Sequence, residues 1–167
     1  VMVFACGRRA AAKLCAGMSE GDAVKEYLAV VHGVPENQTG DYRDFLLHDP
    51  VKNRTEAVSV PHEKAKEASL SYRLIDTVTA EERFSLLLIR LHTGRTHQIR
   101  AQLSSRGMPV AGDGKYGAHD RCGLALWSYR LTFRHPVTKK KLVFAEWPEK
   151  TMPWNLFADM GIRSEEI

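Results

Sequence analysis

The sequence of 167 residues predicts an α+β fold, in which a mixed, largely antiparallel sheet carries a few flanking helices. Strand-like segments outnumber segments with helical periodicity, and the helices stand apart from one another along the chain. Two pairs of strands are joined by short polar turns, which is typical of antiparallel hairpins. Because no repeat, linker or break in composition interrupts the chain, residues 1–167 are expected to form one domain.

The first part of the chain alternates between short elements. Val1–Ala5 is predicted to be a short apolar strand. Arg8–Gly21 is predicted to be a helix, because small and apolar residues recur every three or four positions and a glycine follows them. Lys25–His32 is a strand candidate, and Gly33–Gly40, with its proline, asparagine and glycine, is a turn-rich connection.

The middle of the chain predicts more strands. Tyr42–Leu47 and Thr55–Val60 flank a polar loop and have the length of short strands. Ser69–Thr79 and Arg83–His92 form the clearest hairpin, joined through Thr79–Glu82.

The rest of the chain begins with a helix over Thr96–Arg106, with Thr96 as its N-cap and a glycine after its end. A glycine-rich loop covers Gly112–Gly117. Ser128–Arg134 and Lys141–Trp147 then form a last hairpin. A short helix is expected to follow Pro153.

Composition excludes several classes of protein. Hydrophobic residues at 44% and charged residues at 26% indicate a globular domain and exclude disorder and collagen. No apolar run approaches the ~18 residues of a membrane span and no signal peptide opens the chain, so we expect a cytoplasmic protein without a membrane partner. Cys6, Cys15 and Cys122 form no C-x-x-C pair, which predicts reduced thiols and no metal site.

Positive charge is concentrated between Arg90 and Arg121. This window holds six cations and two acids, so its net charge equals the +4 of the whole chain. Cations interleaved with glycine and histidine indicate a phosphate-rich partner such as RNA. A merely solvated face would mix its cations with acids.

The segment from Leu91 to Gly117, LHTGRTHQIRAQLSSRGMPVAGDGKYG, carries the most chemical information. A strand reaches a glycine turn there and a helix begins, which exposes N–H groups that favour an anion. His97 and Arg100 are three residues apart and share a helix face, whereas Ile99 and Leu103 should face the core. Arg100 is therefore placed to bind a carboxylate or a phosphate.

These residues resemble the RluA-type pseudouridine synthases, whose motif is close to L-x-T-G-R-T-H-Q-I-R followed by G-x-P-I-x-G-D-x-x-Y-G. Leu91–Arg100 and Gly107–Gly117 match it almost throughout. The resemblance extends from Val1 to about Pro148 and includes Lys25-Glu-Tyr-Leu-Ala, which is similar to the family's K-x-Y-x-A strand. Trp127 departs from the family's histidine in L-x-L-H.

The resemblance implies an RNA-modifying isomerase that needs no cofactor and no metal. It would flip a uridine out of its stack, break the glycosidic C–N bond and rejoin the base through carbon. Ribosomal RNA is the expected substrate and transfer RNA the next, and a monomer is expected. The family's nucleophilic aspartate lies in H-R-L-D-x-x-T-S-G, which these residues lack. We therefore expect a catalytic domain truncated at its amino end, with the aspartate upstream of Val1.

The resemblance also assigns roles to individual residues. Tyr27 matches the tyrosine that stacks on the target base, and Arg100 matches the arginine that pairs with the catalytic aspartate. The RNA-binding candidates are Arg95, His97, Lys115 and Arg106. His97 is also a candidate for holding the turn by hydrogen bonds, and Asp113 is expected to order its own glycine loop.

Two alternatives use the same residues. One is an RNA-cleaving enzyme in which His92 and His97 act as acid and base, with Arg95 on the phosphorus centre; this requires both histidines to face one site. The other is a catalytically silent RNA-binding remnant of the family.

Overall fold

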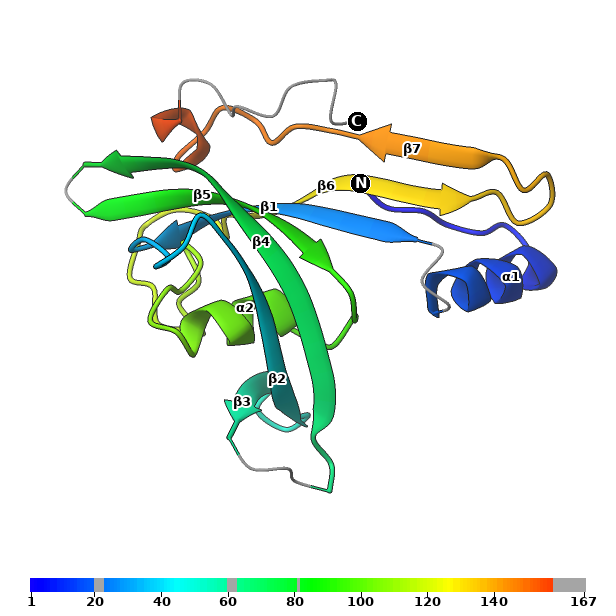
Figure 1. The fold of residues 1–167 in the computed structure, drawn as a ribbon, viewed down its shortest axis with the longest axis horizontal. Coiled ribbons are helices and arrows are strands. Elements are labelled where there is room, and N and C mark those ends of the chain that lie inside the picture. Colours follow the sequence, from blue (N-terminus) through cyan, green and yellow to red (C-terminus); the bar gives the residue numbers. More distant parts are fainter. Residues whose placement is uncertain (20–22, 60–62, 81, 158–167) are drawn as a thin grey trace.

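The computed structural model describes residues 1–19, 23–59, 63–80 and 82–157 and contains one seven-stranded sheet in the order β3-β2-β4-β5-β1-β6-β7 (Figure 1). Every strand pair is antiparallel, which confirms the predicted α+β class. The strands are β1 (Val24–His32), β2 (Thr39–Asp49), β3 (Arg54–Val58), β4 (Lys66–Thr79), β5 (Arg83–Leu91), β6 (Leu126–Arg134) and β7 (Lys141–Ala145). The helices are α1 (Arg8–Ser19), α2 (Gln98–Ser104) and the 3-10 turn η1 (Trp154–Leu156).

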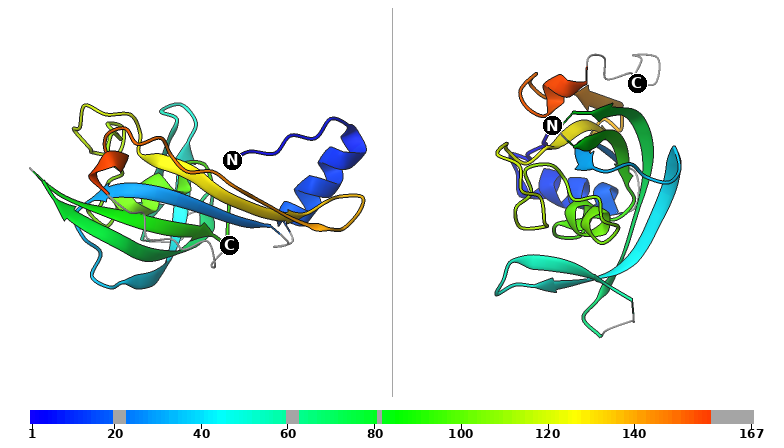
Figure 2. Two further views of the ribbon diagram at one scale, coloured as in Figure 1. Left: turned by 90° about the horizontal axis from the view of Figure 1, so that it is seen from above. Right: turned by 90° about the vertical axis from the view of Figure 1, so that its left-hand side faces the viewer.

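Strands β1 and β5, at the centre of the sheet, carry apolar side chains that the rest of the protein buries. Leu28–Val31 and Leu86–Leu87 are fully buried in these two strands. Helix α2 adds Ile99 and Leu103 to this core and packs Ala101 against β2 and β4. The sheet curls around α2, so the helix lies between the central strands and the β2–β3 hairpin (Figure 2). This arrangement positions the segment that the motif had singled out.

Most predicted elements are confirmed, with shifted ends. The strand at 25–32, the hairpin at 69–92 and the last hairpin all form. The predicted strands at 42–47 and 55–60 form as β2 and β3. Helix α1 begins at Arg8 as expected, whereas the proposed stop at Gly21 lies outside the described residues. None of the described helices has the length and apolar character of a membrane span.

Two local predictions are wrong, and the end of one helix is shifted. Val1–Ala5 is not a strand: the Val1 ammonium donates to the Ser128 carbonyl, and Val1 and Val3 pack on the sheet face through their side chains. The N-cap of α2 is His97, in the left-handed region at φ 51°, because residues 93–97 form a wider turn than a direct Thr96 cap allows. Helix α2 ends at Ser104, two residues before the predicted Arg106, and the short helix expected after Pro153 forms as the 3-10 helix η1.

Candidate active site

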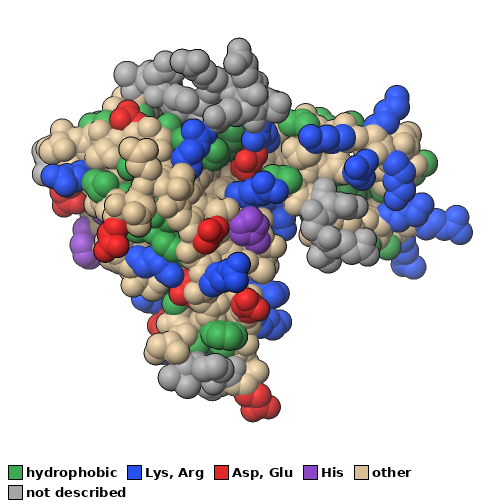
Figure 3. Space-filling model, in the orientation of Figure 1, with side chains coloured by type: hydrophobic (Ala, Val, Ile, Leu, Met, Phe, Trp, Pro, Cys, Tyr) green, Lys and Arg blue, Asp and Glu red, His purple; other side chains and the backbone are tan. Residues whose placement is uncertain are grey.

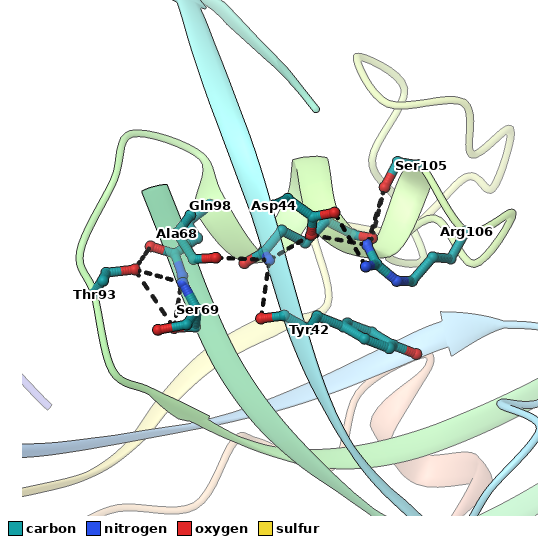
Figure 4. A network of polar contacts seen from close by, with 9 residues as sticks. Tyr42, Asp44, Ala68, Ser69, Thr93, Gln98, Ser105 and Arg106 are labelled. Carbon is teal, nitrogen blue, oxygen red and sulfur yellow. Dashed lines mark hydrogen bonds and ion pairs between the residues drawn. The ribbon is translucent and has the colours of Figure 1, made fainter. Parts of the chain in front are cut away.

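The turn before α2 is held by the buried side chain of Gln98. Its Oε1 accepts hydrogen bonds from Thr93 Oγ1 at 2.8 Å and from the Arg95 amide at 3.0 Å, and its Nε2 donates to the Ser69 carbonyl at 3.0 Å (Figure 4). Gln98 is only 3% exposed, so these hydrogen bonds satisfy polar atoms that are shielded from water. The turn is therefore fixed against β4.

Arg100 leaves α2 toward the 112–118 loop and meets a buried carboxylate there. Its Nε donates to Asp113 Oδ2 at 2.6 Å and its Nη2 donates to Asp113 Oδ1 at 2.7 Å. The Asp113 side chain is 1% exposed and that of Arg100 is 16% exposed. The hydrogen bonds to Asp113 raise the pKa of Arg100 above its already high value, so the guanidinium is always charged. This fork orients Arg100 rigidly.

The expected partner of Arg100 was an upstream aspartate, and the structure adds Asp113 as a second acid. Asp113 orders its loop as predicted, but through its backbone carbonyl, which accepts from the amides of Tyr116 and Ala118. A guanidinium has five N–H donors and Asp113 takes two of them. Nη1 of Arg100 makes no hydrogen bond to any described residue, so one edge of the guanidinium is open to a further acceptor.

Tyr116 connects three elements around Arg100. Its hydroxyl accepts from the Thr55 amide on β3 at 2.8 Å and lies 3.1 Å from Nδ1 of His97. The guanidinium carbons of Arg100 and Arg54 lie 4.8 and 5.2 Å from its ring centroid. Burial and the charge of Arg100 lower the pKa of His97, which favours a neutral imidazole. His97 thus holds the turn, as one of its two predicted roles required, and its RNA contact stays a prediction.

The other RNA-binding candidates differ in how their charge is used. Arg95 is exposed and donates through Nε to the Glu67 carbonyl at 3.0 Å, which leaves its charge unpaired among the described residues. Lys115 is exposed and donates to the Asn53 carbonyl at 3.1 Å.

Arg106 is held more tightly than these two. It donates to both oxygens of Asp44, at 3.0 and 3.1 Å, and its guanidinium lies 3.9 Å from the Tyr42 ring centroid (Figure 4). Arg106 therefore fastens α2 to β2, and its RNA contact stays a prediction.

Tyr27 lies on β1, opposite Ile89 of β5 and Ser128 of β6. It is half-buried and makes no hydrogen bond to a described residue, so its hydroxyl is available to a ligand. No hydrogen bond joins Tyr27 to Arg100 within the described residues.

Lys25 shares the strand face of Tyr27, two residues away, and is a residue for which the sequence predicted no role. Its Nζ lies 3.6 Å from the position that a Cβ on Gly94 would take, so the ammonium rests against the glycine turn. No described carboxylate forms an ion pair with it. The i, i+2 spacing to Tyr27 is the sequence signal that could have singled it out.

The loop of Asp113 is also anchored from its other side, which no sequence pattern indicated. The Asp120 carboxylate accepts from the Gly112 amide at 2.9 Å and lies 2.7 Å from Nε2 of His32. Nδ1 of His32 lies 2.8 Å from Glu82. These three side chains line a cavity of about 830 Å³. They tie the loop to the ends of β1 and β5.

The geometry does not support the RNA-cleavage alternative. His92 is exposed and its Nε2 lies 2.8 Å from Ser71 Oγ on β4, whereas His97 faces Tyr116. The two imidazoles therefore have different surroundings. Among the described residues, no group of three or more His, Cys, Asp or Glu side chains is arranged to hold a metal ion.

Residues 1–105 match the family model described as RNA pseudouridylate synthase. The chain belongs to this family. It is 32% identical over 161 residues to the ribosomal large subunit pseudouridine synthase D of Zymomonas mobilis, covering 89% of this chain and 49% of that protein. An uncharacterized RNA pseudouridine synthase of Aquifex aeolicus is 31% identical over 156 residues, covering 86% and 48%. The chain thus spans about half the length of the curated relatives it matches.

Solved structures show the same fold. The human RNA Pseudouridylate Synthase Domain Containing 1 superposes with a TM-score of 0.74 at 24% identity, covering 92% of this chain and 65% of that one. The family match confirms the resemblance that the Leu91–Gly117 motif predicted, and the superposition confirms the fold.

Proposed function

We propose that the protein containing this chain is an RNA pseudouridine synthase that isomerises uridines in RNA, with ribosomal RNA as the main substrate. Family membership and the relatives named as ribosomal large subunit synthases support this proposal. The observation that carries it is Arg100, a partly buried arginine whose direction the buried Asp113 fixes while one edge of its guanidinium is open. Such an arginine can hold a second carboxylate ionised. We further propose a cytoplasmic monomer that needs neither metal nor cofactor.

The nucleophilic aspartate is proposed to lie upstream of Val1. The Val1 ammonium donates to the Ser128 carbonyl, and Ser128 is opposite Tyr27 in the β1–β6 register. A segment preceding Val1 would therefore enter beside Tyr27. An aspartate in that segment would bind the open edge of Arg100, which keeps the carboxylate charged and directed at the ribose.

Tyr27 and the surrounding cations are proposed to hold the RNA. The Tyr27 ring would stack on the flipped uracil, and its free hydroxyl would lie near the ribose. Lys25, next to it on the strand, is placed to bind an adjacent phosphate. Arg95 and Lys115 are proposed phosphate contacts as well. Arg106 and His97 would contribute less, because Asp44 neutralises the first and the second favours its neutral form.

The test is release of tritium from RNA that carries 5-tritiated uridine. The intact protein should release tritium without added metal or cofactor, whereas a chain of residues 1–167 alone should not. Activity of the 167-residue chain would refute the upstream aspartate. If the encoded protein has no aspartate segment before Val1 and binds RNA without releasing tritium, the silent RNA-binding alternative is correct.

A further inference from the structure

One end of the described part of the molecule carries cations without any acid. It consists of residues 1–19, which include α1, and residues 131–145, which include the last four residues of β6, the β6–β7 turn and β7. We call it the basic end. Its seven cations are Arg8, Arg9, Lys13, Arg134, Lys139, Lys140 and Lys141. The chain as a whole has a net charge of only +4, so the remainder of the sequence is net acidic.

The two segments of the basic end are neighbours in space. Leu14 and Met18 of α1 pack against Leu131 and Phe133 of β6. Lys13, Arg134 and Lys139 line the same small hollow between α1 and the β6–β7 turn. Figure 3 shows Lys and Arg side chains over this end with no Asp or Glu among them on the visible face. Charges far apart in the sequence are therefore combined into one surface.

The cations of the basic end also keep their charge. None of the seven forms an ion pair with a described acid. In the Arg90–Arg121 window, by contrast, Asp113 neutralises Arg100 and Asp44 neutralises Arg106. Two cations of the window are thus paired with carboxylates, whereas the basic end keeps all seven of its charges without an acidic partner among the described residues.

The basic end is next to the proposed base-binding residue. Ala23, just before β1, packs with Leu131 and Phe133 of the basic end, and Tyr27 is the fourth residue of β1. RNA whose target base stacks on Tyr27 can therefore continue across this end. Helix α1 has 12 residues and a length of about 18 Å, which is enough to follow several phosphates.

We propose that the basic end is a second RNA-binding surface, which holds the sugar–phosphate backbone beside the target uridine without reading its sequence. This inference rests on the proposed function, because it takes the RNA substrate as its ligand. The basic end is expected to increase the affinity for RNA and to take no part in the chemical step.

The test is a charge-neutralised variant of the intact protein, Lys13→Gln/Lys139→Gln/Lys140→Gln. Binding of a fluorescent, uridine-containing RNA hairpin is measured by anisotropy at several salt concentrations. Each lost phosphate contact should reduce the log–log salt slope by about 0.7, so the triple variant should lose about 2. By the same relation its affinity at ~0.1 M salt should fall on the order of 100-fold. The isomerisation rate at saturating RNA should stay unchanged.

The matched control is Lys52→Gln/Lys66→Gln/Lys150→Gln, which makes the same charge change at exposed lysines elsewhere. It should leave the slope close to that of the parent. An unchanged slope in the first variant, or an equal change in the control, overturns the proposal. So does a first variant that loses binding to phosphatidylserine vesicles while its RNA slope is kept, since that outcome assigns the surface to membranes.

The proposed function can fail separately from this inference. If the first variant loses the slope but the parent releases no tritium from uridine-labelled RNA, the surface stands and the enzymatic proposal fails. If the parent releases tritium and the first variant keeps the parent's salt slope, the enzymatic proposal stands and the proposed surface fails.

Discussion

Replacing Arg100 with alanine should destabilise the protein as well as inactivate it. The substitution removes both donors from Asp113, whose carboxylate is 1% exposed, and leaves a buried charge without a partner. Breaking a buried ion pair in this way costs about 3–5 kcal/mol. Since the Arg100 side chain is 16% exposed, water can reach the vacated space, and we expect a loss near the lower end, about 3 kcal/mol. Ile99 and Leu103 still hold α2, so the domain should remain folded.

The assay is urea unfolding of the intact protein, monitored by tryptophan fluorescence. Arg106→Ala is the matched control: its partner Asp44 is 17% exposed and Arg106 is 29% exposed, so its loss should be smaller, about 1 kcal/mol. Arg100→Gln/Asp113→Asn should recover much of the stability, because a neutral amide pair replaces the orphaned charge. An Arg100→Ala protein within about 0.5 kcal/mol of the parent would refute the buried pair.

Turnover separates the second role of Arg100 from this structural one. Arg100→Gln/Asp113→Asn should stay slower than the parent by orders of magnitude under single-turnover conditions, because the upstream aspartate has lost its cation. Its RNA affinity should change by less than about tenfold. An equal loss of affinity and rate would make Arg100 a phosphate clamp.

Further predictions concern the base, the phosphates and the loop. Tyr27→Phe should keep RNA affinity but slow single-turnover isomerisation, whereas Tyr27→Ala should also weaken binding. Arg95→Ala should reduce the salt slope of RNA binding by about 0.7–0.9. Gly112→Ala should lower the free energy of unfolding by at least about 2 kcal/mol in urea, since φ is +74° and a Cβ would lie 2.3 Å from a backbone oxygen. Burial raises the pKa of Asp120, but hydrogen bonds from the Gly112 amide and His32 outweigh it, so the net pKa is below the ordinary value. The lowered pKa means that ionised Asp120 stabilises the folded protein. This stabilisation is present above the unfolded-state pKa and is lost as pH falls through the folded-state pKa. Asp120→Asn should therefore flatten the acid limb of the curve of stability against pH.

Each of these has an outcome that contradicts it. A Tyr27→Phe protein as fast as the parent would leave a role for the ring alone, and an unaltered slope in Arg95→Ala would make that residue structural. Gly107→Ala has a similar φ of +71° with open space around it, so an equal loss there would show that backbone strain and not the clash is responsible. A parallel acid limb in Asp120→Asn would mean that the Asp120 bonds do not survive in solution.

Local patterns in the sequence determined the fold class and the family. Alternating and apolar runs predicted all seven strands as separate elements in the correct order, because side-chain periodicity is set by neighbours in the chain. The Leu91–Gly117 motif identified the family for the same reason: its residues are contiguous. The N-cap of α2 was harder to predict from local sequence than the strands were. The Thr96 cap failed because Gln98 is bonded to Ser69, a residue of a distant strand, and this bond sets the width of the turn.

Only the tertiary structure decided which charges have partners. The sequence showed that Arg100 and Arg106 lie in a basic window, but it could not show that Asp113 and Asp44 neutralise them or that Lys25 has no such partner within the described residues. Nor could it show that α1 and the β6–β7 turn form one surface, although they are more than a hundred residues apart. The physical reason is that an electrostatic interaction depends on distance in space and on burial, and the fold sets both.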